Sequence, residues 1–144
     1  MVARVRFLLL SVAVLAAPFQ SVRAENLEHV KQVRETGQCP TCDLSSANLS
    51  GLVSPEADLR NADLNYAVLY KARLNKANLN GATLKGANLT GADLTGANLT
   101  GANLTGADLS GANLSGSIGA RLGKAITDVT TTCPDGANGP CVVK

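Results

Sequence analysis

The sequence predicts an all-β solenoid, because a regular five-residue repeat fills most of the chain. Residues 42–116 divide into fifteen consecutive blocks that read approximately Ala-(Asn/Asp)-Leu-x-x. Leu is the central residue of fourteen blocks, Ala precedes the centre by two positions in thirteen, and Gly closes nine. Aromatic residues make up only 3% of the 144 residues, which is too few for a core of large side chains.

The period of five fits neither of the two common elements. On a helix, successive central Leu side chains would point about 140° apart, and on a flat strand they would alternate between faces. A chain that turns after every block can instead direct each Leu and each Ala inward. Gly at the block end supplies the backbone conformation that a tight turn needs. We therefore expect an interior of Leu and Ala enclosed by polar corners.

These blocks, above all residues 87–116, resemble the pentapeptide-repeat family. The resemblance covers 75 of the 144 residues and implies a right-handed quadrilateral β-helix of about four coils. Residues twenty apart would then stack at about 4.8 Å. Leu49, Leu69, Leu89 and Leu109 would form one interior ladder. Residues 52–56 lack the central Leu and contain a Pro, which predicts a bulge or a distorted corner in the first full coil.

Residues 1–24 have the order of a secretory signal peptide. Two arginines precede an apolar run over residues 7–17, and a small-residue end predicts cleavage after Ala24. The run is too short to span a bilayer comfortably, and a buried or membrane-anchoring helix is the alternative interpretation. Residues 25–41 are expected to form a short N-terminal helical cap, because apolar residues recur at near-helical spacing before Gly37.

Residues 117–144 are expected to form an irregular final coil and a C-terminal cap. After Gly116 the register breaks, and residues 117–119 read as a three-residue insertion. Residues 120–124 fit the repeat again, which favours an irregular coil to about residue 129 over a helix.

Four cysteines lie at the two ends of the repeats, Cys39 with Cys42 and Cys133 with Cys141. In an exported chain an even number predicts disulfides, and the solenoid between the ends favours pairing within each end. Pairing of Cys133 with Cys141 would close the C-terminal tail. For Cys39 and Cys42 three interpretations stay open: a structural disulfide, free inward thiols, or a redox or metal centre. Asp43 stands where c-type haem attachment requires His, which excludes haem.

The remaining polar residues indicate no catalytic site. His29 is the only His, and we expect it to be solvated on the charged face of the N-terminal helix. Asp58, Asp63, Asp93 and Asp108 precede central Leu residues, where hydrogen bonds to the corner backbone explain them better than acid-base catalysis. We therefore expect no enzymatic activity, no cofactor and no metal.

The net charge argues against nucleic acid as a partner. Cleavage after Ala24 would remove three of the thirteen basic residues and none of the eleven acidic ones, which leaves a charge of −1. Such a surface suits neither binding of nucleic acid nor acidic mimicry of it. Topoisomerase binding by DNA mimicry, known for some pentapeptide-repeat proteins, is therefore a disfavoured alternative.

One coil departs from the uncharged exterior and forms a candidate binding belt. Its residues are Arg60, Tyr66, Tyr70, Lys71, Arg73 and Lys76, and Lys85 of the next coil joins them. Such a mixture could bind a protein or an anionic envelope component, because Tyr is a favoured contact residue. Charges that only keep the surface soluble are the alternative.

Together these features predict a non-catalytic structural or protein-interaction module that acts as a monomer and has no membrane span after export. The family resemblance suggests the periplasm or, in a cyanobacterium, the thylakoid lumen. A thiol-disulfide function of Cys39 and Cys42 is the alternative.

Overall fold

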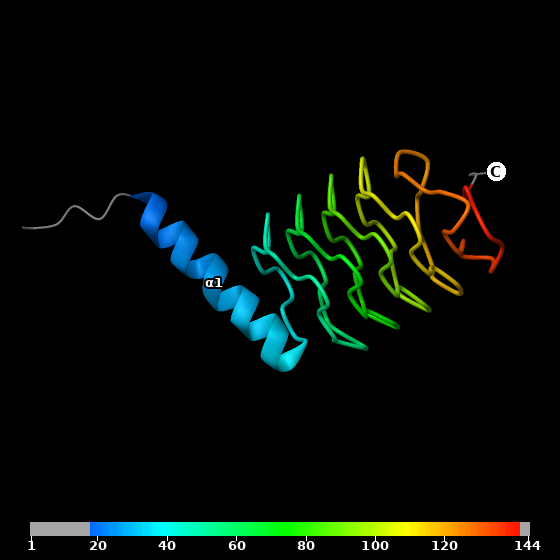
Figure 1. The fold of residues 1–144 in the computed structure, drawn as a ribbon. Helices are drawn as coiled ribbons and strands as arrows, with labels where there is room; N and C mark the ends of the chain where they lie inside the picture. The colour runs from blue at the N-terminus through cyan, green and yellow to red at the C-terminus, as the bar shows by residue number, and fades with distance from the viewer. Residues whose placement is uncertain (1–17, 142–144) are drawn as a thin grey trace, which may run out of the picture.

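The computed structural model describes residues 18–141, and their side chains from Asn26 onward (Figure 1). The chain begins with α1, Pro18–Thr36. The described chain after α1 consists of turns and isolated β-bridges, with no longer strand (Figure 1). Most of the predicted signal peptide lies outside the described residues, and α1 runs through the expected cleavage site after Ala24.

Parallel bridges join residues that lie twenty positions apart. Asp43 pairs with Asp63, Asp63 with Thr83, and Thr83 with Asn103. The bridges recur every five residues, so each coil of twenty residues has four sides, numbered here by their ladders. The ladders begin at Gln38 on side 1, Asp43 on side 2, Asn48 on side 3 and Val53 on side 4.

The interior of the coils is formed by the central Leu and the preceding Ala of each block. On side 3, Leu49, Leu69, Leu89 and Leu109 are all at most 1% exposed. Backbone hydrogen bonds hold successive coils together, as where the Leu69 N–H donates to the Asn88 carbonyl at 2.7 Å. The predicted all-β solenoid with inward Leu and Ala is therefore confirmed.

Each corner places one residue, two positions after the block centre, in the left-handed backbone region. From Gly81 to Gly116 this residue is always Gly. In the earlier coils it is mostly a residue with a side chain: Thr41, Ser46, Glu56, Asn61, Tyr66, Lys71 and Lys76. A left-handed conformation costs about 1–2 kcal/mol for such residues. The early coils thus carry projecting corner side chains at the expense of backbone strain.

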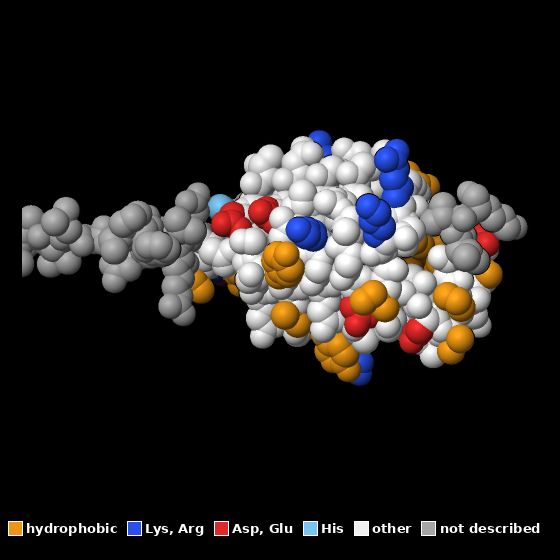
Figure 2. All heavy atoms as spheres, turned by 90° about the horizontal axis from the view of Figure 1, so that it is seen from above, with side chains coloured by type: hydrophobic (Ala, Val, Ile, Leu, Met, Phe, Trp, Pro, Cys, Tyr) orange, Lys and Arg blue, Asp and Glu red, His pale blue; other side chains and the backbone are white. Residues whose placement is uncertain are grey.

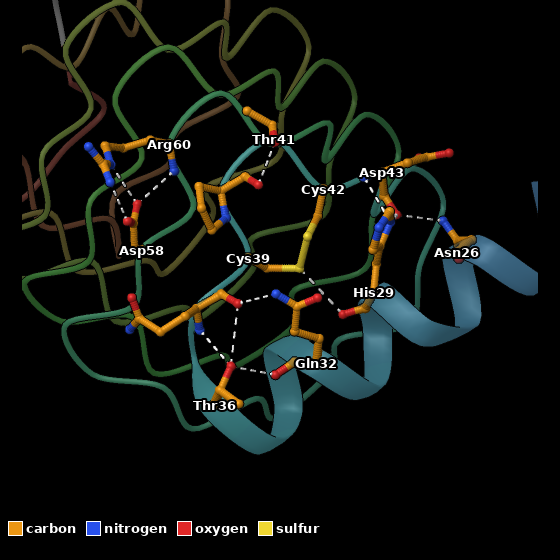
Figure 3. The surroundings of a disulfide bond; sticks show 12 residues. Asn26, His29, Gln32, Thr36, Cys39, Thr41, Cys42, Asp43, Asp58 and Arg60 are labelled. Carbon is orange, nitrogen blue, oxygen red and sulfur yellow. Dashed lines mark hydrogen bonds and ion pairs between the residues drawn. A yellow bond between two sulfur atoms is a disulfide. The ribbon is translucent and has the colours of Figure 1, made fainter.

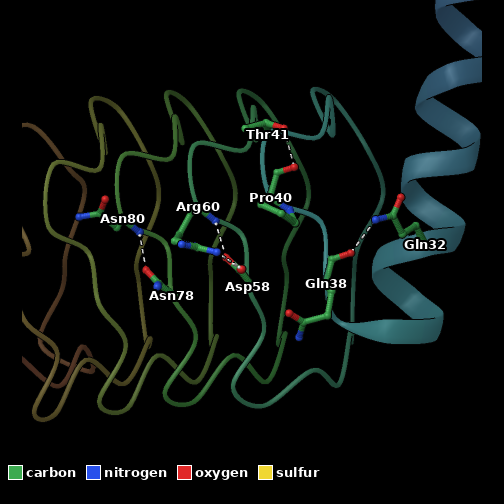
Figure 4. Close-up of polar contacts among 8 residues, drawn as sticks. All are labelled: Gln32, Gln38, Pro40, Thr41, Asp58, Arg60, Asn78 and Asn80. Atoms are coloured by element: carbon green, nitrogen blue, oxygen red, sulfur yellow. Dashed lines mark hydrogen bonds and ion pairs between the residues drawn. The ribbon is translucent and has the colours of Figure 1, made fainter.

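The predicted role of the Asp residues before the block centre is confirmed. The Oδ1 atoms of Asp58, Asp63, Asp93 and Asp108 each accept the backbone N–H two residues further on. Figure 4 shows the same turn at Asn78. These carboxylates are therefore parts of corners.

The bulge predicted for residues 52–56 is wrong, because the corner there is regular. Ser54 is 7% exposed at the block centre, and its N–H donates to the Arg73 carbonyl at 3.0 Å, as a central Leu would. Pro55 follows the centre, a position whose N–H elsewhere bonds only to an Asn or Asp side chain. Pro therefore removes no ladder bond there.

The regular pattern begins earlier than expected. Gln38 forms the first bridge, and Cys39 occupies a fully buried block centre, one block before the expected start at residue 42. The N-terminal disulfide therefore lies within the first coil.

The three-residue insertion predicted at residues 117–119 is wrong, because the repeat register continues through Ile118. Ser117 is buried where the repeat has Ala, and Ile118 still pairs with Asn98 at the twenty-residue spacing. The next bridge joins Ile126 to Asp108, which are eighteen residues apart. The final coil is thus two residues short between its first and third sides, and it regains one residue before the fourth, where Asn113 pairs with Thr132.

Candidate functional site

The seven belt residues encircle the solenoid and do not share one face. Arg60 lies at the corner after side 1, Tyr66 and Lys85 after side 2, Tyr70 and Lys71 after side 3, Lys76 after side 4, and Arg73 on side 4. A flat partner surface could contact only the members on adjacent sides.

Two belt residues have partners within the chain. The Arg60 guanidinium donates to both Asp58 carboxylate oxygens, at 2.8 and 2.6 Å, and this pairing lowers the pKa of Asp58 (Figure 4). The Lys76 Nζ lies 3.8 Å from the Glu56 carboxylate, and both side chains are exposed, so this pair is weak. Arg60 in particular is less available to a ligand.

The belt residues that lie together flank side 3. We call Tyr66, Tyr70, Lys71 and Lys85 the side-3 patch. Tyr66 is 58% exposed and Tyr70 is 42% exposed. The Lys71 Nζ lies 5.1 Å from the centre of the Tyr70 ring, a cation–π contact. Half-buried Val68 lies between the two tyrosines on side 3.

The patch is supported by glycines of the next coil. A Cβ atom on Gly86 would lie 2.7 Å from Cε1 of Tyr66, so the ring rests directly on the Gly86 backbone. Lys71 lies against Gly91 in the same way, at 3.3 Å from its Cβ position. Sequence reasoning missed these glycines, although the twenty-residue spacing from Tyr66 to Gly86 was a usable signal. The lack of a side chain at Gly86 is what leaves room for the Tyr66 ring.

The rest of the visible surface is largely uncharged. On the face drawn in Figure 2, Lys, Arg and hydrophobic side chains lie among many uncharged polar groups along the coils. Further exposed apolar side chains lie near the C-terminal end, namely Ile118, Ile126 and Val129.

Cys39 and Cys42 form a disulfide inside the first coil. Cys39 is 0% exposed at a block centre and Cys42 is 5% exposed at an Ala position. The Cys39 Sγ lies 3.6 Å from the His29 carbonyl of α1 (Figure 3). Of the three open interpretations, the structure contains the disulfide, and α1 covers it.

Side chains of α1 cover the carbonyl edge of the first coil. The Gln32 amide donates to a carbonyl of side 1 at 2.7 Å and the Asn26 amide to one of side 2 at 3.1 Å (Figures 3 and 4). Arg34 donates to a carbonyl of side 3 at 2.8 Å. These carbonyls have no preceding coil with which to pair. The polar face of α1 therefore blocks an edge that could otherwise accept another strand.

The prediction that His29 is solvated is wrong. Its ring is half-buried, and its Nδ1 lies 3.2 Å from the Asp43 backbone nitrogen, whose N–H it can accept. That N–H also lacks a preceding coil. His29 therefore completes the edge that α1 covers, a role that the sequence spacing of α1 did not reveal.

At the other end, a disulfide joins Cys133 to Cys141. The tail folds back through an antiparallel bridge between Thr132 and Asn138. The Asp128 Oδ1 accepts hydrogen bonds from Thr130 and Thr131 of the final coil and from the Gly111 N–H of the preceding one. The Thr130 hydroxyl in particular lowers the pKa of Asp128 to about 2.

The described residues contain no group of three or more His, Cys, Asp or Glu side chains that could hold a metal ion. In the same part of the chain, no helix has the length of apolar sequence needed to cross a bilayer.

Residues 42–81 and 77–116 match the family described as pentapeptide repeats, with eight copies. The chain belongs to this family. Pentapeptide-repeat proteins are typically non-catalytic structural or interaction modules. No curated protein sequence matches the chain.

Solved pentapeptide-repeat structures are similar to the chain. A protein from the Arabidopsis thaliana thylakoid lumen is 33% identical over 67% of this chain and 61% of its own, with a TM-score of 0.52. HetL from the cyanobacterium Nostoc sp., involved in heterocyst differentiation regulation, is 35% identical over 71% and 55%, with a TM-score of 0.42. The fluoroquinolone resistance protein QnrB1 is 24% identical over 62% and 49%, with a TM-score of 0.38. The chain thus spans about three fifths of the Arabidopsis relative.

Proposed function

We propose that this protein is an exported, non-catalytic interaction module whose side-3 patch binds another protein or an anionic envelope component. The observation that carries the proposal is the ordered support of the patch. Tyr66 rests on Gly86 and Lys71 on Gly91, so the contact residues lose little freedom on binding. Tyr is one of the residue types that contribute most of the binding energy in protein interfaces, and the two neighbouring lysines can pair with anionic groups.

Photocrosslinking tests this proposal. The photoreactive residue p-benzoylphenylalanine is placed at position 66 or 70 of the exported protein. We expect adducts in cell-envelope fractions from both positions and none from position 115, at the corner after side 4. In a second arm, Lys71→Ser with Lys85→Ser should weaken the adducts. Equal adducts from position 115, or adducts that survive the double substitution unchanged, would contradict binding by side 3.

Two observations support export. Both cysteine pairs are disulfides, which persist in oxidising compartments. The Arabidopsis relative resides in the thylakoid lumen. The α1 side chains that bond to the first coil lie at residues 26–36, so removal of residues 1–24 would leave them in place. Mass spectrometry of the native protein should find Glu25 at the N-terminus, and an intact Met1 would overturn the proposal.

We assign a structural role to the disulfide of Cys39 and Cys42. Thiol-disulfide exchange needs direct attack on a sulfur atom, and both residues are buried beneath α1. The wild-type protein should therefore lack insulin-reductase activity, and Cys39→Ser should keep the far-UV circular dichroism of the coils. Rapid turnover that the substitution abolishes would instead establish an oxidoreductase.

A further inference from the structure

The short final coil leaves a hollow on side 2. Its volume is about 690 Å³, within the range of about 300–1,000 Å³ that is usual for ligand sites. The lining consists of residues 101–105 and of Ala120, Arg121, Gly123 and Lys124. The hollow thus lies at the position where a further residue would pair with Asn103 and continue the side-2 ladder.

Backbone groups at the floor of the hollow lack the partners that their equivalents have one coil earlier. There, the Asn103 N–H donates to the Ala82 carbonyl at 3.0 Å, and the Leu84 N–H donates to the Asn103 carbonyl at 2.8 Å. The corresponding groups of the next rung are the Ala102 carbonyl and the Leu104 N–H. Neither bonds to any described residue. One rung of an extended strand would satisfy both.

The chain fixes this gap through a close approach at Gly119. A Cβ atom on Gly119 would lie 2.5 Å from the Thr100 Cα atom, so only Gly allows the chain to pass there. After this contact the chain reaches the third side two residues early, through Leu122, which is 6% exposed. Gly119 and buried Leu122 thus fix the segment that carries the lining residues Ala120, Arg121 and Gly123.

The charged residues of the lining indicate which chemical group the ligand carries. Arg121 and Lys124 are the charged residues of the lining, and both are exposed. An Arg guanidinium and a Lys ammonium favour a carboxylate. A side of the coil spans about three extended residues, or roughly 10 Å.

We propose that the hollow binds a short extended peptide segment of another protein that carries a carboxylate. One residue of that segment donates its N–H to the Ala102 carbonyl and accepts the Leu104 N–H, which continues the ladder by strand addition. Its carboxylate lies against Arg121 and Lys124. This site lies on side 2 of the final coil, so it is separate from the side-3 patch and does not depend on it.

Amide hydrogen exchange of the whole mature protein provides the first test. We expect the Leu104 N–H to exchange at least tenfold faster than the Leu64 and Leu84 N–H groups, which occupy the same ladder. Protection of Leu104 equal to that of Leu84 would show that the chain itself or bound water fills the rung, and would overturn the proposal.

The second test is a titration followed by NMR, with a mixture of acetylated tetrapeptides that end in Glu and vary over apolar and β-branched residues elsewhere. The Leu104 amide resonance should shift downfield, and a mixture ending in Gln amide should bind at least fivefold more weakly. A mixture N-methylated at every peptide bond should not bind, because it lacks the N–H that Ala102 accepts. The absence of a Leu104 shift at millimolar concentration, or an equal shift with the N-methylated mixture, would refute strand addition.

Two variants separate charge from backbone pairing. Arg121→Gln with Lys124→Gln should keep the fast exchange of Leu104 but weaken binding of the Glu mixture to the level of the Gln mixture. Insertion of two residues after Gly119 should restore the twenty-residue spacing between Asp108 and Ile126, protect Leu104 and abolish binding. Unchanged binding by the charge variant would overturn the carboxylate assignment even where the insertion variant does not fold.

Discussion

Substitution of Leu89 by Ala tests the central packing argument. Leu89 is 1% exposed and lies between Leu69 and Leu109 in the interior ladder of side 3. Large-to-small substitutions of buried Leu cost about 2–5 kcal/mol, and the cost rises with the cavity that remains. Here the coils cannot close the cavity, because the Leu89 N–H is bonded to the next coil at 2.7 Å. We therefore expect a loss of about 3–5 kcal/mol.

The assay is urea unfolding followed by far-UV circular dichroism, with the loss taken from midpoints at an unchanged denaturant slope. Thr105→Ala is the matched control, since Thr105 is exposed and should change stability by no more than about 0.5 kcal/mol. A loss below about 1 kcal/mol for Leu89→Ala, or equal losses for the two variants, would refute the reasoning.

Three further predictions concern the corners and the final coil. Gly86→Ala should displace the Tyr66 ring. Gly106 has the same left-handed backbone but no ring against it, so Gly106→Ala is the control. Both variants should lose stability, but only Gly86→Ala should change the fluorescence quenching of Tyr66. Ser117→Ala should raise the unfolding free energy by about 1 kcal/mol in urea, because the buried Ser117 hydroxyl has no hydrogen-bond partner among the described residues; a loss of stability would contradict this. The Asp128 carboxylate, with its pKa lowered to about 2, should stabilise the fold fully above the usual pKa of 3.8 and lose this effect as pH falls toward 2. The stability difference between wild type and Asp128→Asn should therefore shrink over that range, and a constant difference would exclude the effect.

The repeat made the coils predictable from sequence, because a five-residue period leaves few ways to bury every central Leu. Predictions from the repeat failed where they relied on the type of a single residue rather than on its position in the block. Pro55 predicted a bulge, yet its missing N–H is not part of any ladder. At Ser117 and Ile118, the altered residue types hid a register that backbone pairing maintains for two more positions.

The candidate site was less predictable, because its geometry depends on which residues share a side or a corner of the coils. The belt was predicted as one group, but its residues lie at all four corners of the coils. One of them, Arg60, forms a bidentate contact with Asp58. The edge role of His29 depends on the angle at which α1 meets the first coil, which local spacing does not determine. The cysteine pairing within each end followed from the distance between the ends and is present in the structure.

Because the cross-section has four sides, the number of blocks between two surface sites determines both how far apart the sites lie and in which directions they face. Insertion of twenty residues between the side-3 patch and the side-2 hollow would move the two apart by about 4.8 Å and keep their relative orientation. Insertion of five residues would instead rotate one against the other by a quarter turn. A whole coil thus adds translation without rotation, whereas a single block adds a quarter turn with only a quarter of that translation, and both leave every interior contact of the same type.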